Sequence, residues 1–138
     1  MINFLNFYSL LYISDKDSNP NLKSKNKFEK FKIYLENAMF LNNSLTEKNL
    51  NFILITNNIK FLKKNYDTKD LKIKEIKFRK TVKKNITFYS SHFKIDLYKY
   101  LSNLKTYSCC LDVDCVAINK PKKIFFKNIK IFISKNLI

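Results

Sequence analysis

The sequence of 138 residues contains no glycine, which limits both its backbone conformations and the chemistry open to it. Glycine lets a backbone approach a phosphate group without obstruction by a Cβ atom. The G-x-G-x-x-G turn of dinucleotide-binding proteins and the P-loop of nucleoside triphosphatases both depend on it. The sequence therefore excludes both motifs. Any phosphate bound here must be held by a metal ion, by lysines or by helix N-termini.

Apolar runs that alternate with helical stripes predict an α/β fold. Asn26 followed by Glu29 is typical of a helix start, and the apolar stripe from Phe93 to Leu104 is the most regular in the chain. The expected strands are 2–13, 50–56, an exposed edge strand at 71–78, 107–111, 115–118 and 124–133; the expected helices are 27–48, 59–65 and a helix capped by Ser90 or Ser91 that runs to 104. This order predicts a single domain over 1–138, with a mostly parallel sheet and helices on both faces.

The chain is strongly basic, with 27 lysines and arginines, 11 acidic residues and a formal charge of +16. Lysines mixed with aromatic residues over 72–84 and 120–130 fit RNA binding, so a basic RNA-binding or ribosome-associated protein is the alternative interpretation. Arg79 is the only arginine, however, and the residue types in excess are those with A/T-rich codons. Because genome base composition alone explains this charge, nucleic acid is the disfavoured partner.

Cysteine usage and the N-terminal segment indicate a reducing compartment. Cys109, Cys110 and Cys115 are clustered and odd in number, which does not suit a disulfide framework. Together with His92 they lack the spacing of a zinc site, since adjacent cysteines on a strand point to opposite faces. The apolar run 2–13 is too short to span a bilayer and lacks the basic start of a signal peptide. We expect reduced cysteines and a cytoplasmic protein.

The segment that most strongly indicates a binding or catalytic site contains Asp112 and Asp114, which alternate with apolar residues. Burying carboxylates in an apolar strand is costly unless something pairs them. At the carboxyl end of a strand, aspartates two residues apart leave the same face, where they can hold a divalent cation that presents open positions to a diphosphate. Two aspartates in a solvent-exposed turn between strands have the same spacing, and the spacing does not separate these alternatives.

The context of this D-x-D motif resembles the nucleotide-sugar-binding half of GT-A-type glycosyltransferases, especially bacterial enzymes of capsular and surface-polysaccharide synthesis. In that family a helix with a basic residue leads into a strand and then into an L-D-x-D motif. The matching segments here are 88–100 and 111–114, and upstream 35–38, 43–45 and 51–57 look like the family's first helix and second strand. The resemblance covers residues 2–120 and leaves 121–138 as a divergent tail.

The resemblance implies a Rossmann-like fold and metal-dependent transfer of a sugar from a nucleoside diphosphate. Asp114 would ligate manganese (Mn²⁺) or magnesium (Mg²⁺), and Asp112 would contact the metal or the ribose of the donor. Lys94 would reach the diphosphate, and Asp96 would hold Lys94 or a sugar hydroxyl, although a solvated helix face explains both residues as well. The implied partners are a nucleotide-sugar donor and a saccharide or lipid-linked acceptor, with peripheral association at the inner face of the membrane.

The sequence after the D-x-D motif departs from the family. The acceptor-binding half of the family follows this motif, whereas residues 120–138 contain lysines and apolar residues but no acid and no histidine. That segment offers no general base and no third metal ligand. We therefore expect a truncated or degenerate glycosyltransferase that binds its donor, with little or no transfer by this chain alone.

Overall fold

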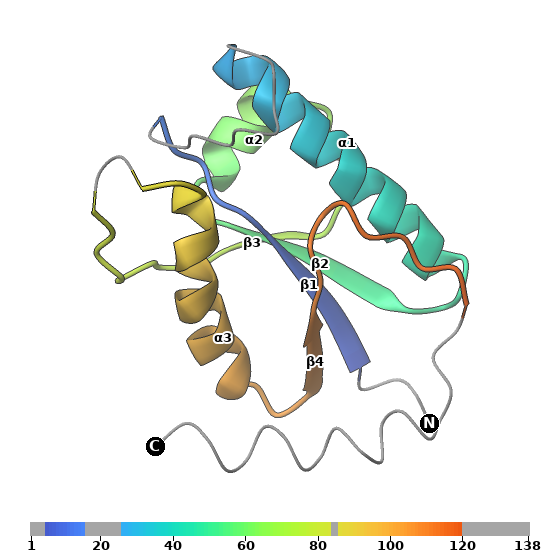
Figure 1. The fold of residues 1–138 in the computed structure, drawn as a ribbon. Helices are drawn as coiled ribbons and strands as arrows, with labels where there is room; N and C mark the ends of the chain where they lie inside the picture. The colour runs from blue at the N-terminus through green and yellow to red at the C-terminus, as the bar shows by residue number, and fades with distance from the viewer. Residues whose placement is uncertain (1–4, 16–25, 84–85, 120–138) are drawn as a thin grey trace.

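A computed structural model describes residues 5–15, 26–83 and 86–119 (Figure 1). The elements, in chain order, are β1 (Leu5–Leu11), α1 (Lys27–Thr46), β2 (Asn51–Thr56), α2 (Ile59–Asn65), β3 (Ile73–Glu75), the 3₁₀ turn η1 (Tyr89–Phe93), α3 (Lys94–Ser102) and β4 (Tyr107–Cys110). All strand pairs are parallel, in the order β3-β2-β1-β4. The structure thus confirms the predicted α/β class with a parallel, Rossmann-like sheet. None of the helices in the described ranges is long and apolar enough to cross a membrane.

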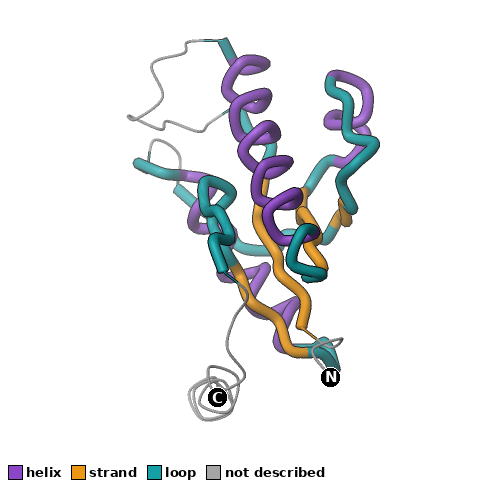
Figure 2. Tube along the Cα trace, turned by 90° about the vertical axis from the view of Figure 1, so that its right-hand side faces the viewer, coloured by secondary structure: helices purple, strands orange, loops and turns teal. Residues whose placement is uncertain are grey.

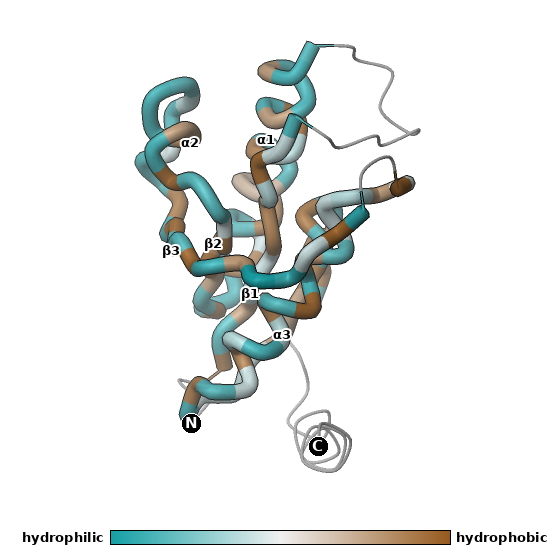
Figure 3. Tube along the Cα trace, turned by 90° about the vertical axis from the view of Figure 1, so that its left-hand side faces the viewer, coloured by the Kyte–Doolittle hydropathy of each residue, from teal (hydrophilic) through white to brown (hydrophobic). Residues whose placement is uncertain are grey.

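Helices cover both faces of the sheet, and the alternation of side chains along β1 shows why. Phe7 and Leu11 pack with α1 and α2 in the larger core, whereas Tyr8 packs against α3 on the opposite face. Figure 2 shows that the long helix α1 runs alongside the strands, and in Figure 3 hydrophobic and hydrophilic positions alternate along it. Successive strand residues point to opposite faces, so a strand covered on both sides must be apolar throughout. This explains the nearly continuous apolar run in β1.

Asparagine residues flank both ends of α1. The one that follows the helix, Asn49, stands where many helices have a glycine. The side chain of Asn26 accepts a hydrogen bond from the Phe28 N–H at 2.9 Å, which confirms the predicted helix start. At the other end Asn49 has a φ of 55°, and the Leu50 N–H donates to the Leu45 carbonyl at 3.0 Å. This pattern is the Schellman motif, in which asparagine is the usual substitute for glycine.

The order of the strands reverses between β1 and β4. From β1 the chain moves to β2 and then to the edge strand β3, and it returns through α3 to place β4 on the other side of β1. The edge position of β3 agrees with the sequence prediction. In parallel sheets of this kind ligands bind in the crevice beyond the carboxyl ends of the strands, at the point where the order reverses. That point lies here at the ends of β1 and β4.

The entry to α3 differs from the sequence prediction. Neither Ser90 nor Ser91 caps a helix there; the chain instead enters α3 through η1, whose N-cap residue Phe88 makes no side-chain cap hydrogen bond. Phe88 has a φ of 54°, a left-handed conformation that costs a bulky residue roughly 1–2 kcal/mol. Asparagine tolerates this conformation, as Asn49 does, but a phenylalanine occupies this position and carries the strain.

Residues 115–118 do not form the predicted strand. A turn after β4, closed by the Cys115 N–H donating to the Asp112 carbonyl at 3.1 Å, directs the chain away from the sheet. The extended segment that follows lies against α1, where the Ala117 N–H donates to the Ser44 Oγ at 3.0 Å. Its apolar alternation therefore serves packing against a helix and not pairing in a sheet. The last predicted strand, 124–133, lies outside the described residues.

Candidate functional site

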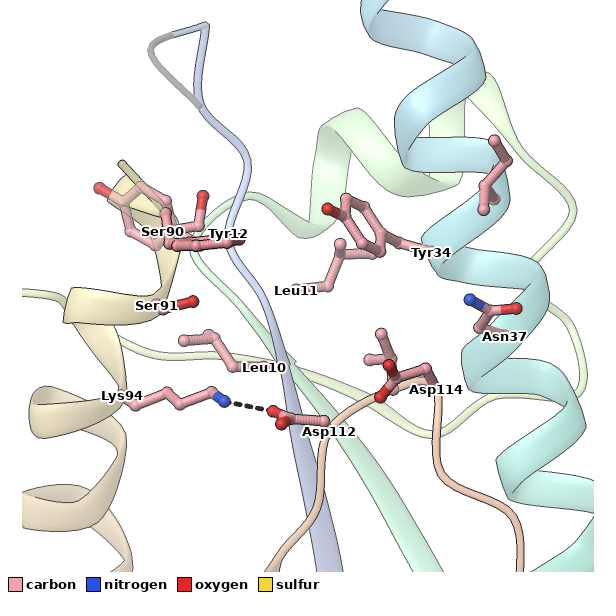
Figure 4. Close-up of a pocket in the computed structure, with 13 residues that line it drawn as sticks. Leu10, Leu11, Tyr12, Tyr34, Asn37, Ser90, Ser91, Lys94, Asp112 and Asp114 are labelled. Carbon is pink, nitrogen blue, oxygen red and sulfur yellow. Dashed lines mark hydrogen bonds and ion pairs between the residues drawn. The ribbon is translucent and has the colours of Figure 1, made fainter. Parts of the chain in front are cut away.

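A pocket of about 380 Å³ lies beyond the carboxyl ends of β1 and β4 (Figure 4). It is lined by the end of β1, by one face of α1, by η1 with the start of α3, and by the turn after β4. The lining residues are Leu10, Leu11, Tyr12, Ile33, Tyr34, Asn37, Phe88, Ser90, Ser91, Lys94, Asp112, Val113 and Asp114. Four segments that are distant in the sequence thus meet where the strand order reverses.

The turn that carries the two aspartates is anchored to β1. The Leu111 N–H donates to the Tyr8 carbonyl at 2.8 Å, and the buried Ser9 Oγ donates to the Leu111 carbonyl at 2.7 Å. Alternate residues from Leu111 onward pack inward against the larger core, which leaves Asp112 and Asp114 exposed. Both aspartates line the pocket, as the D-x-D interpretation requires. They also lie in a turn, although the structure places a strand on only one side of it.

Lys94 and Asp112 form an ion pair within the pocket (Figure 4). Lys94 is the first residue of α3, and its side chain is 27% exposed, compared with 59% for Asp112. Burial lowers the pKa of Lys94, but the hydrogen bond and the charge of Asp112, together with Tyr98 and Cys110, raise it more, so this pKa lies above its ordinary value. Among the described residues, no hydrogen bond or ion pair involves the Asp114 carboxylate.

Asp96 occupies a different place from the one that the sequence suggests. Its carboxylate accepts hydrogen bonds from the backbone N–H groups of Arg79 at 3.2 Å and Lys80 at 2.8 Å, and it does not line the pocket. The expectation that Asp96 holds Lys94 is wrong, because Lys94 bonds to Asp112. Asp96 fixes the segment before η1 to α3, and a contact of Asp96 with a donor sugar stays a prediction.

Aromatic side chains form a part of the pocket that no sequence motif predicts. Tyr12 stacks on Phe93 with ring centroids 3.8 Å apart and planes 3° from parallel, and Phe78 meets Tyr12 edge-on. Burial, followed by Tyr89 and Asp96, raises the pKa of Tyr12, so its hydroxyl stays protonated at neutral pH. Tyr12 follows the apolar first strand directly, and this position at a strand's carboxyl end was the available signal.

Asp112 and Asp114 are the residues of the pocket that could hold a cation, with a phosphate ligand bound beside it. In the described ranges no three His, Cys, Asp or Glu residues are grouped closely enough to hold a metal ion. Two carboxylates are nevertheless sufficient for Mg²⁺ or Mn²⁺ when water and phosphate oxygens complete the coordination. The cysteines are free and partly buried, and burial is the main reason that the pKa of Cys110 rises to about 11. This thiol is therefore a poor metal ligand or nucleophile at neutral pH.

Comparison with known proteins gives no match: no family model, no curated protein and no solved structure resembles this chain significantly. The function of the pocket is therefore inferred from its position in the fold and from the side chains that line it.

Proposed function

We propose that this chain binds a nucleoside diphosphate sugar together with a divalent cation, as the donor domain of a glycosyltransferase-type protein of surface or capsular polysaccharide synthesis. The observation that supports this proposal is the convergence of Lys94, Asp112 and Asp114 on one pocket at the reversal of strand order. Parallel α/β sheets bind nucleotides at this position. The three charged groups come from two segments, the start of α3 and the turn after β4.

The charges of the pocket suit a diphosphate that is bridged by a metal ion. Asp112 and Asp114 supply carboxylate oxygens, the hard ligands that Mn²⁺ and Mg²⁺ take together with phosphate oxygens. Lys94 supplies a positive charge for the phosphate itself. When bound, the cation takes up negative charge as the sugar leaves the diphosphate. These side chains perform the phosphate-holding role that a glycine-rich turn performs in other nucleotide-binding folds.

Aromatic and amide groups elsewhere in the pocket suit the remainder of such a ligand. Tyr34 and Asn37 of α1 line the pocket across from Lys94 (Figure 4). Phe88, the residue before η1, also lines it, with 41% of its surface exposed. Aromatic faces stack on nucleobases, which contributes about 1–3 kcal/mol per base. A nucleotide with its diphosphate at Asp114 and Lys94 would have these groups within the same pocket.

Thermal melting tests the proposal. Uridine, guanosine and cytidine diphosphate sugars should be tested one at a time, each with MnCl₂ and each with EDTA. At least one is expected to raise the melting temperature with Mn²⁺ and not with EDTA, because a ligand at a hundred times its Kd stabilises the folded state by about 2.7 kcal/mol. RNA binding that needs no metal and weakens steeply with salt, without any nucleotide effect, would reject the proposal and support the RNA-binding alternative.

Paired substitutions show whether the aspartates are responsible. Asp114→Asn should abolish the metal-dependent stabilisation and leave the unliganded protein as stable as before, because its carboxylate has no described bond to lose. Asp70→Asn is the matched control, since Asp70 is an exposed aspartate outside the pocket, and this variant should respond to the ligand as the unchanged protein does. An Asp114→Asn variant that keeps the metal-dependent shift would reject the role of Asp114.

A further inference from the structure

The two oppositely charged groups that would receive the cation and the phosphate are bonded to each other. The Lys94 ammonium and the Asp112 carboxylate belong to segments 18 residues apart, and both line the pocket. Lys94 is the less exposed partner, with 27% of its side chain accessible. Taking one partner away from a partly buried pair leaves the other charge without compensation, which is more costly than leaving the pair intact.

We propose that the ion pair between Lys94 and Asp112 blocks the pocket against either ligand alone and makes the binding of cation and diphosphate mutually dependent. This inference rests on the proposed function and goes beyond it. A cation that takes Asp112 on its own leaves the Lys94 ammonium unpaired. A diphosphate that takes Lys94 on its own leaves the Asp112 carboxylate unpaired. When both bind, each charge exchanges one partner for another, and neither is left uncompensated.

Coupling of this kind is reciprocal, so it has two separately measurable sides. If diphosphate raises the affinity for the cation by some factor, the cation must raise the affinity for diphosphate by the same factor. Such factors are typically about 5- to 150-fold. A metal ion and a diphosphate also attract each other directly in solution. The contribution of the ion pair is therefore measured best with each ligand alone, after one partner of the pair has been removed.

Asp114 does not belong to the blocked pair. It lines the same pocket and carries the same charge as Asp112, but it has no described ion pair. Lys99 lies on the same helix as Lys94, is exposed and does not line the pocket. The chain thus provides one matched control for each partner: Asp114 for Asp112, and Lys99 for Lys94.

Isothermal titration of MnCl₂ without nucleotide tests the cation side. Lys94→Met frees Asp112 and is expected to bind Mn²⁺ about fivefold or more tightly than Lys99→Met, which removes the same charge outside the pocket. Lys94→Gln provides a second variant in case the methionine disturbs folding, and circular dichroism checks the fold of each. Equal Mn²⁺ affinities for the Lys94 and Lys99 variants would overturn the inference.

Titration of uridine diphosphate in EDTA tests the diphosphate side. Asp112→Asn frees Lys94 and is expected to bind the nucleotide about fivefold or more tightly than Asp114→Asn, which removes the same charge from the same pocket. Equal affinities of these two variants would overturn the inference. The proposed function has a separate test, because it fails when the unchanged protein shows no metal-dependent binding of nucleotide. The remaining outcome is metal-dependent nucleotide binding by the unchanged protein, with equal affinities for Lys94→Met and Lys99→Met and for Asp112→Asn and Asp114→Asn. It would support the proposed function and reject the role of the ion pair.

Discussion

Replacing Ser9 by alanine should loosen the connection between the sheet and the turn that carries Asp112. Ser9 lies near the middle of β1, its side chain is completely buried, and its Oγ donates to the Leu111 carbonyl at 2.7 Å. Leu111 immediately precedes Asp112, so this bond fixes the start of the D-x-D segment. The change Ser9→Ala removes the donor and leaves the strand, its apolar neighbours and the volume of the core almost unaltered.

The expected loss follows from the two ends of this bond. A typical intramolecular hydrogen bond contributes about 0.5–1.5 kcal/mol, and a buried acceptor left without a donor costs about 1–3 kcal/mol. The bond between Ser9 and Leu111 is partly buried, so water can reach the carbonyl and reduce the penalty. We therefore expect Ser9→Ala to lower the free energy of unfolding by about 1–2 kcal/mol.

Urea denaturation followed by circular dichroism measures this loss as a lower midpoint with an unchanged m value. Ser102→Ala is the matched control, because Ser102 is exposed and its hydroxyl bonds only to the Lys99 carbonyl one turn earlier in α3. The control should change the free energy of unfolding by less than about 0.5 kcal/mol. If Ser9→Ala were no more destabilising than Ser102→Ala, the bond to Leu111 would not anchor the turn.

Three further changes test the backbone and the core by urea denaturation. Asn49→Ala should lower the free energy of unfolding by about 1 kcal/mol, because alanine resists the left-handed φ of 55°. The control Asn49→Gly should not lower it, and equal losses for the two variants would contradict the role of the left-handed conformation at Asn49. Phe88→Asn should leave stability unchanged or raise it by up to about 1 kcal/mol, since asparagine tolerates the φ of 54°, and a clear loss would show that the ring is needed. Leu97→Ala should lower the free energy of unfolding by about 2–5 kcal/mol because Leu97 is fully buried. The control Ile95→Ala, at a position 42% exposed on the same helix, should lower it far less. Similar losses for the two variants would show that Leu97 does not lie on the buried face of α3.

The order of helices and strands was predictable because it rests on local signals. Asn26 and Glu29 identify the start of α1, and the continuous apolar run in β1 indicates a strand covered on both faces. A parallel sheet with alternating helices then follows from general rules of chain connection. The position of Asp112 and Asp114 beside a pocket also follows, because both come directly after a strand at its carboxyl end.

The partners of the charged residues were not predictable because they depend on contacts between distant segments. Asp96 lies two residues after Lys94, yet it bonds to the backbone of Arg79 and Lys80, whereas Lys94 reaches Asp112. Sequence spacing on a helix shows which side chains share a face, but not which loop packs against that face. The strained conformation of Phe88 was hidden for a related reason, since no local motif requires a left-handed residue before η1.

The absence of glycine and the ion pair in the pocket are connected by one physical argument. A glycine-rich turn binds phosphate with backbone N–H groups that carry no net charge and need no counter-ion while the site is empty. A pocket that holds phosphate with side chains must instead contain charged groups, and a partly buried charge such as that of Lys94 is costly unless it is paired. Asp112 provides that pairing, so under the proposed function a diphosphate that takes Lys94 would displace it. If two charges exchange partners on binding, as proposed, binding should be more sensitive to ionic strength than binding to a backbone cradle of the same affinity.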